Sequence, residues 1–236
     1  MRNFAAFILT HGRPDNVETF RKLRYHGYTG RIYLIIDNED AAADRYREKF
    51  GDDNVIVFDK KAMAAKTDAG NNFDDRKVVV YARNANFDIA ESLGLTHFVQ
   101  LDDDYWQFKT RIDSGAKTMR NLDTAFAATL EFLDNTGATS VAWSQGGDHI
   151  GGFKGIMLKR KVMNSFFCRV DRRFQFSGFI NEDVTTYVLE GSRGRLFFTF
   201  YGLQLDQIKT QSNSGGLTDV YLQRGTFLLV SMLHFN

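Results

Sequence analysis

Short apolar runs alternate with amphipathic stretches along the first hundred residues. Short runs that end in polar turns predict buried strands, whereas apolar positions at helical spacing predict helices. The predicted strands are Phe4–Thr10, Arg31–Ile36, Asn54–Phe58 and His97–Leu101. Three helices are predicted. The first is capped by Asp15 or Asn16 and ends at Tyr25, the second is Ala41–Phe50, and the third is Arg76–Leu93, which ends at Gly94.

The pattern is less regular in the rest of the chain. The predicted helices are Asn121–Thr136, Asp183–Glu190 and Val220–Phe227, and the predicted strands are Thr139–Trp143, Lys154–Lys159 and Arg195–Tyr201. The stretch Lys60–Arg76 has little periodicity and predicts a long loop, while Asn213–Gly216 predicts a turn. The closing apolar run LLVSMLHFN predicts a strand that is cut short.

Alternation of strands and helices predicts an α/β fold, with a mainly parallel, Rossmann-like sheet flanked by helices in a single domain over residues 1–236. Ligands of such sheets bind beyond the carboxyl ends of the strands. Thr10, Asp37 and Asp102 each fall at the end of a predicted strand. We therefore expect the functional site where these strand ends meet.

The composition limits the compartment and the partners. Hydrophobic residues make up 43% of the chain, which is enough for a substantial core. The net charge is +1, so a polyanionic partner has to meet a local patch of cations. We expect a cytoplasmic protein, because Cys168 has no disulfide partner, no signal peptide is recognisable, and no apolar run approaches the roughly 20 residues of a membrane helix.

Three adjacent carboxylates follow the fourth predicted strand, at Asp102, Asp103 and Asp104. Their mutual repulsion costs stability unless a positive charge lies among them, and Mn²⁺ or Mg²⁺ prefers such oxygen ligands. In an extended chain Asp102 and Asp104 point to the same side and Asp103 points away. The alternative is a solvated acidic turn, but the apolar strand before it favours a metal site.

A second carboxylate pair, Glu182 and Asp183, follows the Phe-rich segment FQFSGF. A carboxylate in an apolar setting has a raised pKa, which suits a general base that works near neutral pH. Carboxylates also occur at helix N-termini as ordinary caps, and this alternative has equal weight here.

Two weaker signals lie near the predicted strand ends. The turn THGRP at residues 10–14 can present backbone N–H groups to an anion, and Arg83 can pair with phosphate. A lone Arg on a helix is more often solvated. The histidines lack the spacing of metal ligands, and the chain has no GxxxxGK[ST], GxGxxG or GxSxG motif, which argues against P-loop, dinucleotide-binding and serine-hydrolase functions.

The order of these features resembles the fold-A (GT-A) glycosyltransferases, which use nucleotide-diphosphate sugars and carry a DxD motif after a Rossmann-like half. More narrowly, the segments ILTHGRP, YARNANFDIAESLG, LDDDY, INEDVTTYV and TQSNSGGLTDVY resemble the largely phage-encoded TET-associated glycosyltransferases, which are related to the base J glucosyltransferase. This resemblance implies transfer of a sugar, from a UDP-sugar, to the hydroxyl of a 5-hydroxymethylpyrimidine in double-stranded DNA. It also implies a nucleotide-sugar-binding half at about residues 1–105 and an acceptor-binding half at about residues 106–236.

The resemblance assigns roles to the matching residues of this chain. It implies that the donor nucleotide is bound by Thr10, His11, Gly12, Arg13, Asp37, Arg83, Asn84, Asp102 and Asp103. Asp102 and Asp104 would hold the divalent cation, and Asp183 or Glu182 would deprotonate the acceptor in an inverting reaction. Fold-A enzymes draw a further metal ligand from near the C-terminus, where His234 is a weak candidate.

If DNA is the acceptor, its phosphates require cations. The candidate patch consists of Lys159, Arg160, Arg169, Arg172 and Arg173, with phenylalanines interleaved. A solvated charged face over a Phe-rich core is an equally good interpretation. Segments Lys60–Arg76 and Asn213–Gly216 are candidate lids that would exclude water from the donor.

Three other functions remain open at this point. The first is a glycosyltransferase that acts on an acceptor other than DNA. A nucleotidyltransferase would also use paired carboxylates and a metal, but THGRP is a poor match to its Gly-rich, Lys-containing triphosphate loop. A non-catalytic reader of modified DNA would need no metal.

Overall fold

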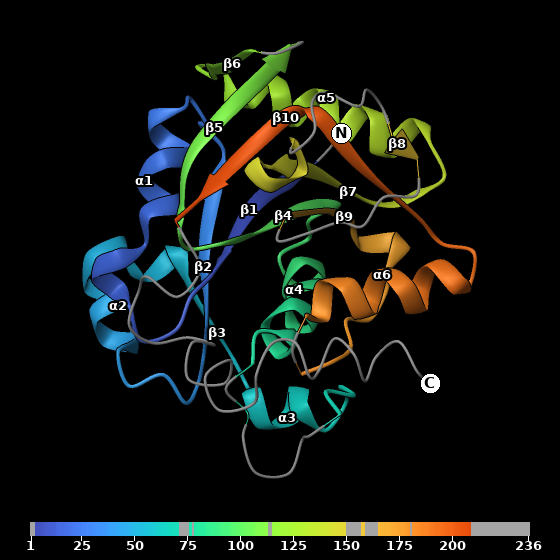
Figure 1. The fold of residues 1–236 in the computed structure, drawn as a ribbon. Helices are drawn as coiled ribbons and strands as arrows, with labels where there is room; N and C mark the ends of the chain where they lie inside the picture. Colours follow the sequence, from blue (N-terminus) through green and yellow to red (C-terminus); the bar gives the residue numbers. More distant parts are fainter. Residues whose placement is uncertain are drawn as a thin grey trace.

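One mixed β-sheet runs through the molecule, with helices on both of its faces (Figure 1). The computed structural model describes residues 3–70, 76, 78–112, 115–149, 157–158, 165–179 and 181–208. The strand order is β3-β2-β1-β4-β9-β7-β10-β5-β6, and β8 pairs with β10. Among the described residues no helix is both long and apolar enough to span a bilayer.

The first half of the sheet is parallel. Its strands are β1 (Phe4–Leu9), β2 (Arg31–Asp37), β3 (Val55–Phe58) and β4 (His97–Asp102). The helices that connect them are η1 (Pro14–Asn16), α1 (Glu18–Tyr25), α2 (Ala43–Phe50), η2 (Asp52–Asn54), α3 (Lys60–Ala64) and α4 (Val80–Ser92). Strands buried on both faces are apolar throughout, which explains the continuous apolar runs of this half.

Antiparallel pairing enters in the second half. Its strands are β5 (Tyr105–Ile112), β6 (Gly115–Thr118), β7 (Ala138–Gln145), β8 (Met157–Leu158), β9 (Ser165–Arg169) and β10 (Leu196–Gln207). Its helices are α5 (Leu122–Asn135), η3 (Gly146–His149), η4 (Val170–Arg172) and α6 (Glu182–Ser192). β9 runs antiparallel to both β4 and β7, and β5 runs antiparallel to β10 and β6, whereas β10 and β7 are parallel.

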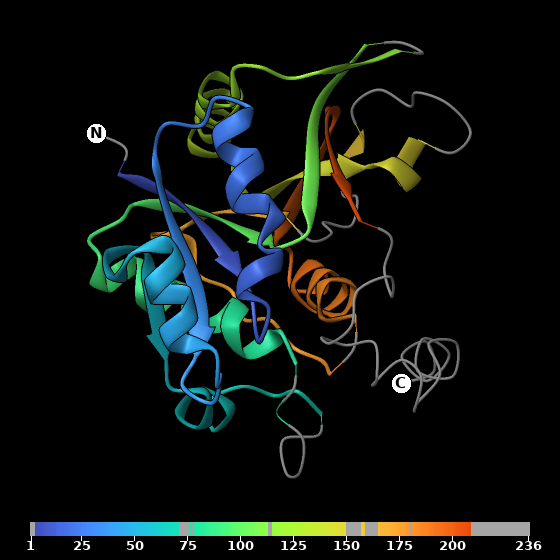
Figure 2. The ribbon, with the colours of Figure 1, turned by 90° about the vertical axis from the view of Figure 1, so that its left-hand side faces the viewer.

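The helices divide into two layers that cover opposite faces of the sheet. Buried side chains of α1, α2 and α5 pack with one set of strand residues, which includes Ile8 and Leu34. Buried side chains of α3 and α4 pack with the other set, which includes Phe7 and Ile35, and Tyr187 of α6 joins them. Figure 2 shows α1 and α2 in front of the sheet. Neighbouring residues of one strand therefore belong to different cores, as the period of two in a strand requires.

The predicted α/β sandwich with a Rossmann-like first half is confirmed, and the strands and helices predicted before Asp102 are all present, apart from their exact ends. The helices predicted at Asn121–Thr136 and Asp183–Glu190 correspond to α5 and α6. Predictions for residues 213–216, 220–227 and 228–236 lie outside the described residues, as does most of the strand predicted at Lys154–Lys159.

Two predictions about local structure were wrong. Residues 60–64 form α3 instead of a loop, because the Asp59 carboxylate caps the helix by accepting a hydrogen bond from the Ala62 N–H at 2.9 Å. A helix of five residues is too short for periodicity to reveal.

The strand predicted at Arg195–Tyr201 continues to Gln207, and β5, β6 and β9 were not predicted. β5 and β9 pair with strands far away in the sequence, so the local pattern carries little signal for them, and β6 depends on its pairing with β5.

Phe126 is the aromatic centre of the core under α5, and its loss should destabilise the fold. Its side chain is buried, and its ring lies 5.1–5.7 Å from the rings of Phe4, Tyr28, Trp143 and Phe167. We expect Phe126→Ala to lower the free energy of unfolding by about 3–5 kcal/mol, through lost burial and a cavity. Urea denaturation followed by circular dichroism measures this change.

The exposed Val188 on α6 provides a matched control for this measurement. Val188→Ala should change the free energy of unfolding by less than about 0.5 kcal/mol, because it removes little buried surface. Equal effects of the two substitutions would contradict the assignment of Phe126 to the core.

Candidate active site

The three polar strand ends meet at one edge of the sheet, as the sequence predicts. β1 lies between β2 and β4, and its last residue, Leu9, is in register with Ile35 on one side and with Asp102 on the other. Thr10 follows directly, and its N–H donates to the carbonyl of Ile35 at 3.3 Å. Asp37 ends β2. The carboxyl ends of these strands are thus neighbours in space.

Asp103 points into the protein and holds the turn that follows β1. Its side chain is buried, and its two oxygens accept hydrogen bonds from the Thr10 hydroxyl at 2.6 Å and from the Arg13 guanidinium at 2.9 Å. Tyr46 of α2 joins this group, since its hydroxyl contacts Thr10 and accepts from the Arg13 N–H. Asp103 is therefore a positioning residue for the THGRP turn. Both of its oxygens have protein partners, which differs from the nucleotide contact that the resemblance implies.

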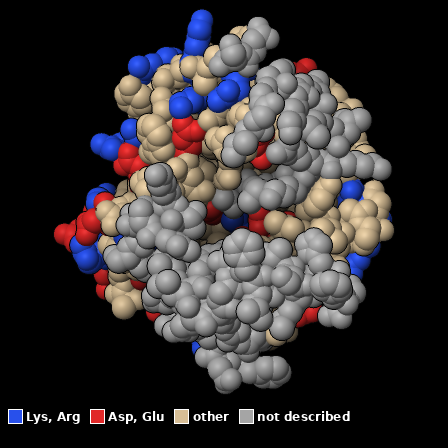
Figure 3. Space-filling view, in the orientation of Figure 1, with Lys and Arg blue, Asp and Glu red and all other residues tan. Residues whose placement is uncertain are grey.

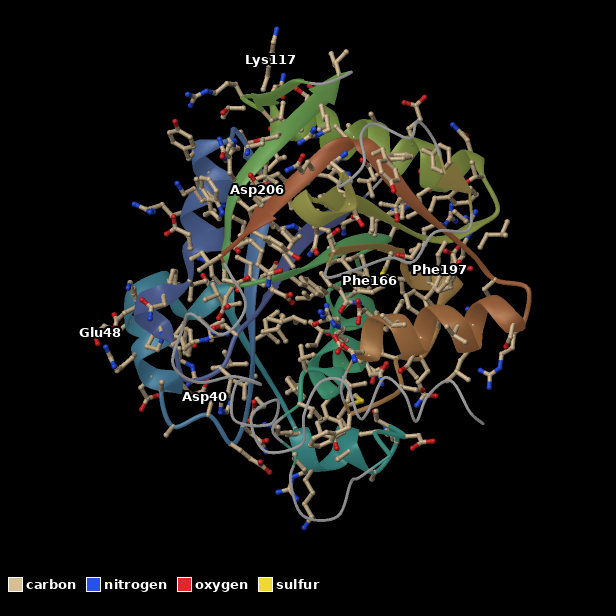
Figure 4. All side chains as sticks on the ribbon, viewed as in Figure 1. Asp40, Glu48, Lys117, Phe166, Phe197 and Asp206 are labelled. Atoms are coloured by element: carbon tan, nitrogen blue, oxygen red, sulfur yellow. The ribbon has the colours of Figure 1, made fainter. Side chains whose placement is uncertain are left out.

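Asp102 belongs to a buried ion-pair chain that crosses to α6. The Arg83 guanidinium donates from Nη2 to Asp102 at 3.1 Å and from Nε to Glu182 at 2.8 Å. The Arg83 side chain is 1% exposed, and it lies 5.3 Å from the ring of Phe166, which is labelled near the middle of Figure 4. Arg83 thus links the end of β4 to the start of α6. A solvated Arg, the more common case on a helix, is not what the structure shows.

Asp104 is the least satisfied carboxylate of the three. Its Oδ2 accepts from the Gln207 amide at 3.2 Å, whereas its buried Oδ1 has no hydrogen-bond partner among the described residues. Burial, together with the charges of Asp102 and Asp103, raises the pKa of Asp104 to about 7. Burial also raises the pKa of Asp102 to about 6, against the opposing charge of Arg83. Without a further cation, ionisation of these carboxylates lowers the stability of the fold.

These observations fit a divalent cation shared by Asp102 and Asp104. The described part of the chain contains no group of three or more His, Cys, Asp or Glu side chains that could hold a metal by themselves. Mg²⁺ characteristically binds through one or two carboxylates together with substrate phosphates, so two carboxylates are a sufficient protein contribution. The Asp104 Oδ1, which has no hydrogen-bond partner among the described residues, and the raised pKa values of Asp102 and Asp104 are the features that such a cation would satisfy.

The end of β2 carries a second charged group. The Asp37 Oδ2 contacts His11 Nδ1 at 2.8 Å and Lys60 Nζ at 3.2 Å, and the side chains of Asp37 and Lys60 are both 7% exposed. Burial opposes ionisation of Asp37, but His11 and Lys60 outweigh it and lower the pKa of Asp37. The hydrogen bond to Asp37 raises the pKa of His11. Lys60 is thus a fixed part of this site and does not belong to a lid.

Asp40 holds the glycine of the THGRP turn. Its carboxylate accepts from the Gly12 N–H and from the Ala42 N–H, each at 2.8 Å. Gly12 has a φ of +68°, a conformation that residues with a side chain rarely adopt. Asp40 therefore fixes the THGRP turn beside Asp37, and the His11 side chain in this turn is half exposed.

The start of α6 brings the second carboxylate pair to the same site. Asn181 has a φ of 55°, a left-handed conformation that Asn tolerates better than most residues and that turns the chain sharply into the helix. Glu182 and Asp183 are both buried as a result. Glu182 is bound to Arg83. Burial raises the pKa of Tyr105, and the charges of Asp102, Asp104 and the nearby Asp183 add to this shift.

Other predicted site residues have structural contacts. The Asn84 side chain donates to Thr67 and exchanges two hydrogen bonds with the backbone of Phe176, so it fixes the segment before α6. Arg172 donates to three backbone carbonyls at the end of α5. Arg169 and Arg173 form ion pairs with nearby carboxylates. His234, Lys159 and Arg160 lie outside the described residues.

Sequence reasoning missed four residues of this site: Asp40, Tyr46, Lys60 and Gln207. Lys60 was assigned to a loop, and Gln207 lies beyond the predicted end of its strand. Tyr46 lies in a correctly predicted helix, but nothing in the pattern shows that its hydroxyl faces the THGRP turn. Asp40, in the acidic segment after β2, gave the one usable signal, because a short polar residue there often caps a turn.

The raised pKa of Asp104 predicts a specific pH dependence of stability in excess EDTA. A carboxyl group whose folded pKa lies above its unfolded value of about 4 stabilises the fold below that value, and this stability is lost as the pH rises through about 7. Asp104→Asn cannot ionise, so we expect it to raise Tm at pH 8 by about 2–4 °C and by less at pH 5.

Differential scanning fluorimetry at the two pH values measures this difference. Glu131→Gln on α5, which removes one exposed carboxylate, should leave Tm unchanged at both. A lower Tm of Asp104→Asn at pH 8 in EDTA would contradict an unfavourable buried charge at this position.

Comparison with known proteins identifies the family and the fold of this chain. The TET-Associated Glycosyltransferase family matches residues 4–216 of the 236-residue chain. No curated protein matches the chain significantly. The chain is similar to the crystal structure of S. aureus TarS 1-349 in complex with UDP-GlcNAc, with a TM-score of 0.50, 11% identity, and coverage of 100% of this chain and 67% of TarS.

Two further crystal structures have a similar fold. The complex of TarS with UDP has a TM-score of 0.52 and 10% identity, and covers 87% of this chain and 60% of TarS. Mouse xyloside xylosyltransferase 1 has a TM-score of 0.44 and 13% identity, and covers 93% of this chain and 92% of that one. In two of the TarS alignments the chain spans only 60% of the length of TarS, and at these identities the likeness shows the fold alone. Because the family match extends over most of the sequence, this chain belongs to the TET-associated glycosyltransferase family and is a glycosyltransferase with a GT-A-like fold.

Proposed function

We propose that this enzyme transfers a sugar from a UDP-sugar to the hydroxyl group of a 5-hydroxymethylpyrimidine in DNA, and that it depends on a divalent cation. The observation that carries the proposal is the acidic turn after β4, where Asp104 is buried with a partnerless oxygen and a pKa raised to about 7. A turn of this kind suits a cation that a nucleotide diphosphate brings with it.

Two observations support a uridine nucleotide as the donor. Crystal structures of the similarly folded TarS contain UDP and UDP-GlcNAc. In this chain, Asp37 lies at the end of β2 with its carboxylate held by His11 and Lys60, and such a fixed carboxylate can accept a hydrogen bond from a base N–H. The half-exposed His11 and the adjoining turn then lie beside the nucleoside.

Asp102 and Asp104 are the residues that would hold Mn²⁺ or Mg²⁺. The bound cation would neutralise charge on the departing diphosphate, which is worth several kcal/mol in such reactions. Arg83 keeps Asp102 ionised and oriented, and Gln207 orients Asp104 through its other oxygen. These contacts fix both carboxylates before the substrate binds, so little reorganisation is required.

Asp183 is the proposed general base. Glu182 is bound to the Arg83 guanidinium, so its role is to position the start of α6. Asp183 is its buried neighbour on the first turn and lies near Tyr105, which directly follows the acidic turn. In an inverting reaction, the Asp183 carboxylate takes the proton of the acceptor hydroxyl while the oxygen attacks the anomeric carbon.

The family description supports DNA as the acceptor, because it names an association with TET proteins. The decisive experiment is to incubate the enzyme and Mn²⁺ with 5-hydroxymethylated duplex DNA and a panel of nucleotide sugars, and to identify the nucleosides by mass spectrometry. We expect one hexose on the modified base with a UDP-sugar, and loss of at least 90% of the activity in excess EDTA. A product that forms equally well in EDTA would contradict the metal role, and a product only on other hydroxyl acceptors would contradict the DNA acceptor.

Asp183→Asn tests the proposed base. We expect kcat to fall about 10²–10⁴-fold, because proton removal by a positioned base contributes this much, while the Kd for the UDP-sugar changes little. Steady-state kinetics and isothermal titration calorimetry measure the two quantities. Asp171→Asn, which neutralises an exposed carboxylate on η4, should leave both unchanged. Normal turnover of Asp183→Asn would exclude this residue as the base.

A further inference from the structure

Cations gather on the β5–β6 hairpin and the adjoining part of α1. Figure 3 shows Lys and Arg side chains over these elements at the top left of the view. The hairpin surface, as we define it, consists of Lys22, Lys109, Arg111, Lys117 and Arg120. Residues 105–120 contain a single carboxylate in their sequence, Asp113, which lies outside the described residues. With a net charge of only +1 for the whole chain, this is a local concentration of positive charge.

Among the described residues, the carboxylates that face this surface come from neighbouring elements, and they neutralise only part of its charge. Asp206 of β10 pairs with Lys109, and Glu18 of α1 lies 3.5 Å from Lys22. Lys117 and Arg120 are exposed. Figure 4 shows Lys117 at the outer end of β6, away from Asp206. The outer part of the surface therefore retains its charge.

Exposed aromatic rings accompany these cations. Trp106 is 40% exposed and Tyr25 is 55% exposed. Lys109 lies 5.6 Å from the ring centre of Trp106, and Arg120 lies 4.7 Å from that of Tyr25. Cations interleaved with exposed aromatic rings are typical of surfaces that bind nucleic acids, because phosphates meet the charges and bases or sugars meet the rings.

The hairpin surface leads directly to the acidic turn. β5 begins at Tyr105, the residue after Asp104, and its eight residues extend roughly 24 Å from there. Its pairing with β10 runs from Tyr105 to Thr110, so Arg111 and Ile112 continue beyond that pairing together with β6. A polyanion bound along this surface would thus extend from the acidic turn to the outer end of the hairpin. Duplex DNA presents one phosphate charge for about every 1.7 Å of its axis and can match this length.

We propose that the hairpin surface binds the phosphate backbone of duplex DNA and presents the hydroxymethylated base to the site. This inference rests on the DNA acceptor proposed above. A two-stranded β-ribbon fits the major groove, where the C5 substituent of a pyrimidine lies, so the β5–β6 hairpin faces the groove that carries the reactive hydroxyl. Phosphate contacts fix the register of the duplex and do not read its sequence.

The other cationic cluster is less suitable for this role. Arg169 is in register with His97 at the start of β4, so it lies at the end of the sheet opposite Asp102. Arg172 is occupied by the carbonyls at the end of α5, and Arg173 is paired with Asp88 and Glu91. DNA bound there would have to span the length of β4 before its base reached the site.

The test compares two double substitutions that remove the same charge. Lys117→Gln with Arg120→Gln changes the hairpin surface, and Arg47→Gln with Lys49→Gln changes exposed cations of α2. Fluorescence anisotropy with a labelled 5-hydroxymethylated duplex measures Kd at several NaCl concentrations. We expect the hairpin variant to weaken binding roughly tenfold at low salt and to reduce the slope of log Kd against log [NaCl] by about 2, because each lost phosphate contact removes about one unit.

The α2 variant should change the slope by much less than one unit, and both variants should keep the wild-type Tm. In transfer assays the hairpin variant should raise KM for DNA about tenfold and leave KM for the UDP-sugar unchanged. If its DNA binding and KM match those of the α2 variant, or if Arg173→Gln reduces the slope instead, the proposal is wrong. Absence of any transfer to DNA by the wild-type enzyme would instead overturn the proposed acceptor, and this inference with it.

Discussion

The site depends on one buried ion-pair chain, Asp102–Arg83–Glu182. Arg83 is 1% exposed and joins the end of β4 to the start of α6, two segments that are far apart in the sequence. Removal of either carboxylate would leave a buried guanidinium incompletely paired, which is costly in a protein interior. The Arg83 guanidinium is therefore held between these two segments. It fixes the distance between the acidic turn and the carboxylate pair of α6, and so between the proposed metal ligands and the proposed base.

The same region shows why a functional site is not optimised for stability. Asp102, Asp103 and Asp104 are consecutive, and burial together with the charges of the two neighbours raises the pKa of Asp104 to about 7. Arg13 and Arg83 neutralise two of the three carboxylates, and the third keeps one oxygen without a partner. A fold selected only for stability would have an uncharged side chain in place of the Asp104 carboxylate. The retained charge agrees with a site that binds a positively charged group only together with its substrate.

The sheet topology separates the proposed donor site from the proposed acceptor surface. Parallel strands β1, β2 and β4 end together and form the edge that the proposed nucleotide occupies. The antiparallel strand β9 then follows β4 in the sheet, and β5 turns away at the acidic turn to pair with β10 and β6. The hairpin surface thus begins where the donor edge ends. Sugar transfer requires this adjacency, because the acceptor hydroxyl has to reach the anomeric carbon of the donor.

The sequence by itself determined the α/β class, the four parallel strands and the convergence of Thr10, Asp37 and Asp102, because local hydrophobic periodicity and the geometry of parallel strands suffice for these. It also indicated the carboxylates of the acidic turn and of α6. Only the tertiary structure decided that Asp103 faces inwards to Thr10 and Arg13, that Arg83 is buried, that Lys60 belongs to the site, and that Arg172 closes α5. The physical reason is that these roles depend on partners 19 to 99 positions away, and the free energy of a charge depends on its surroundings in space.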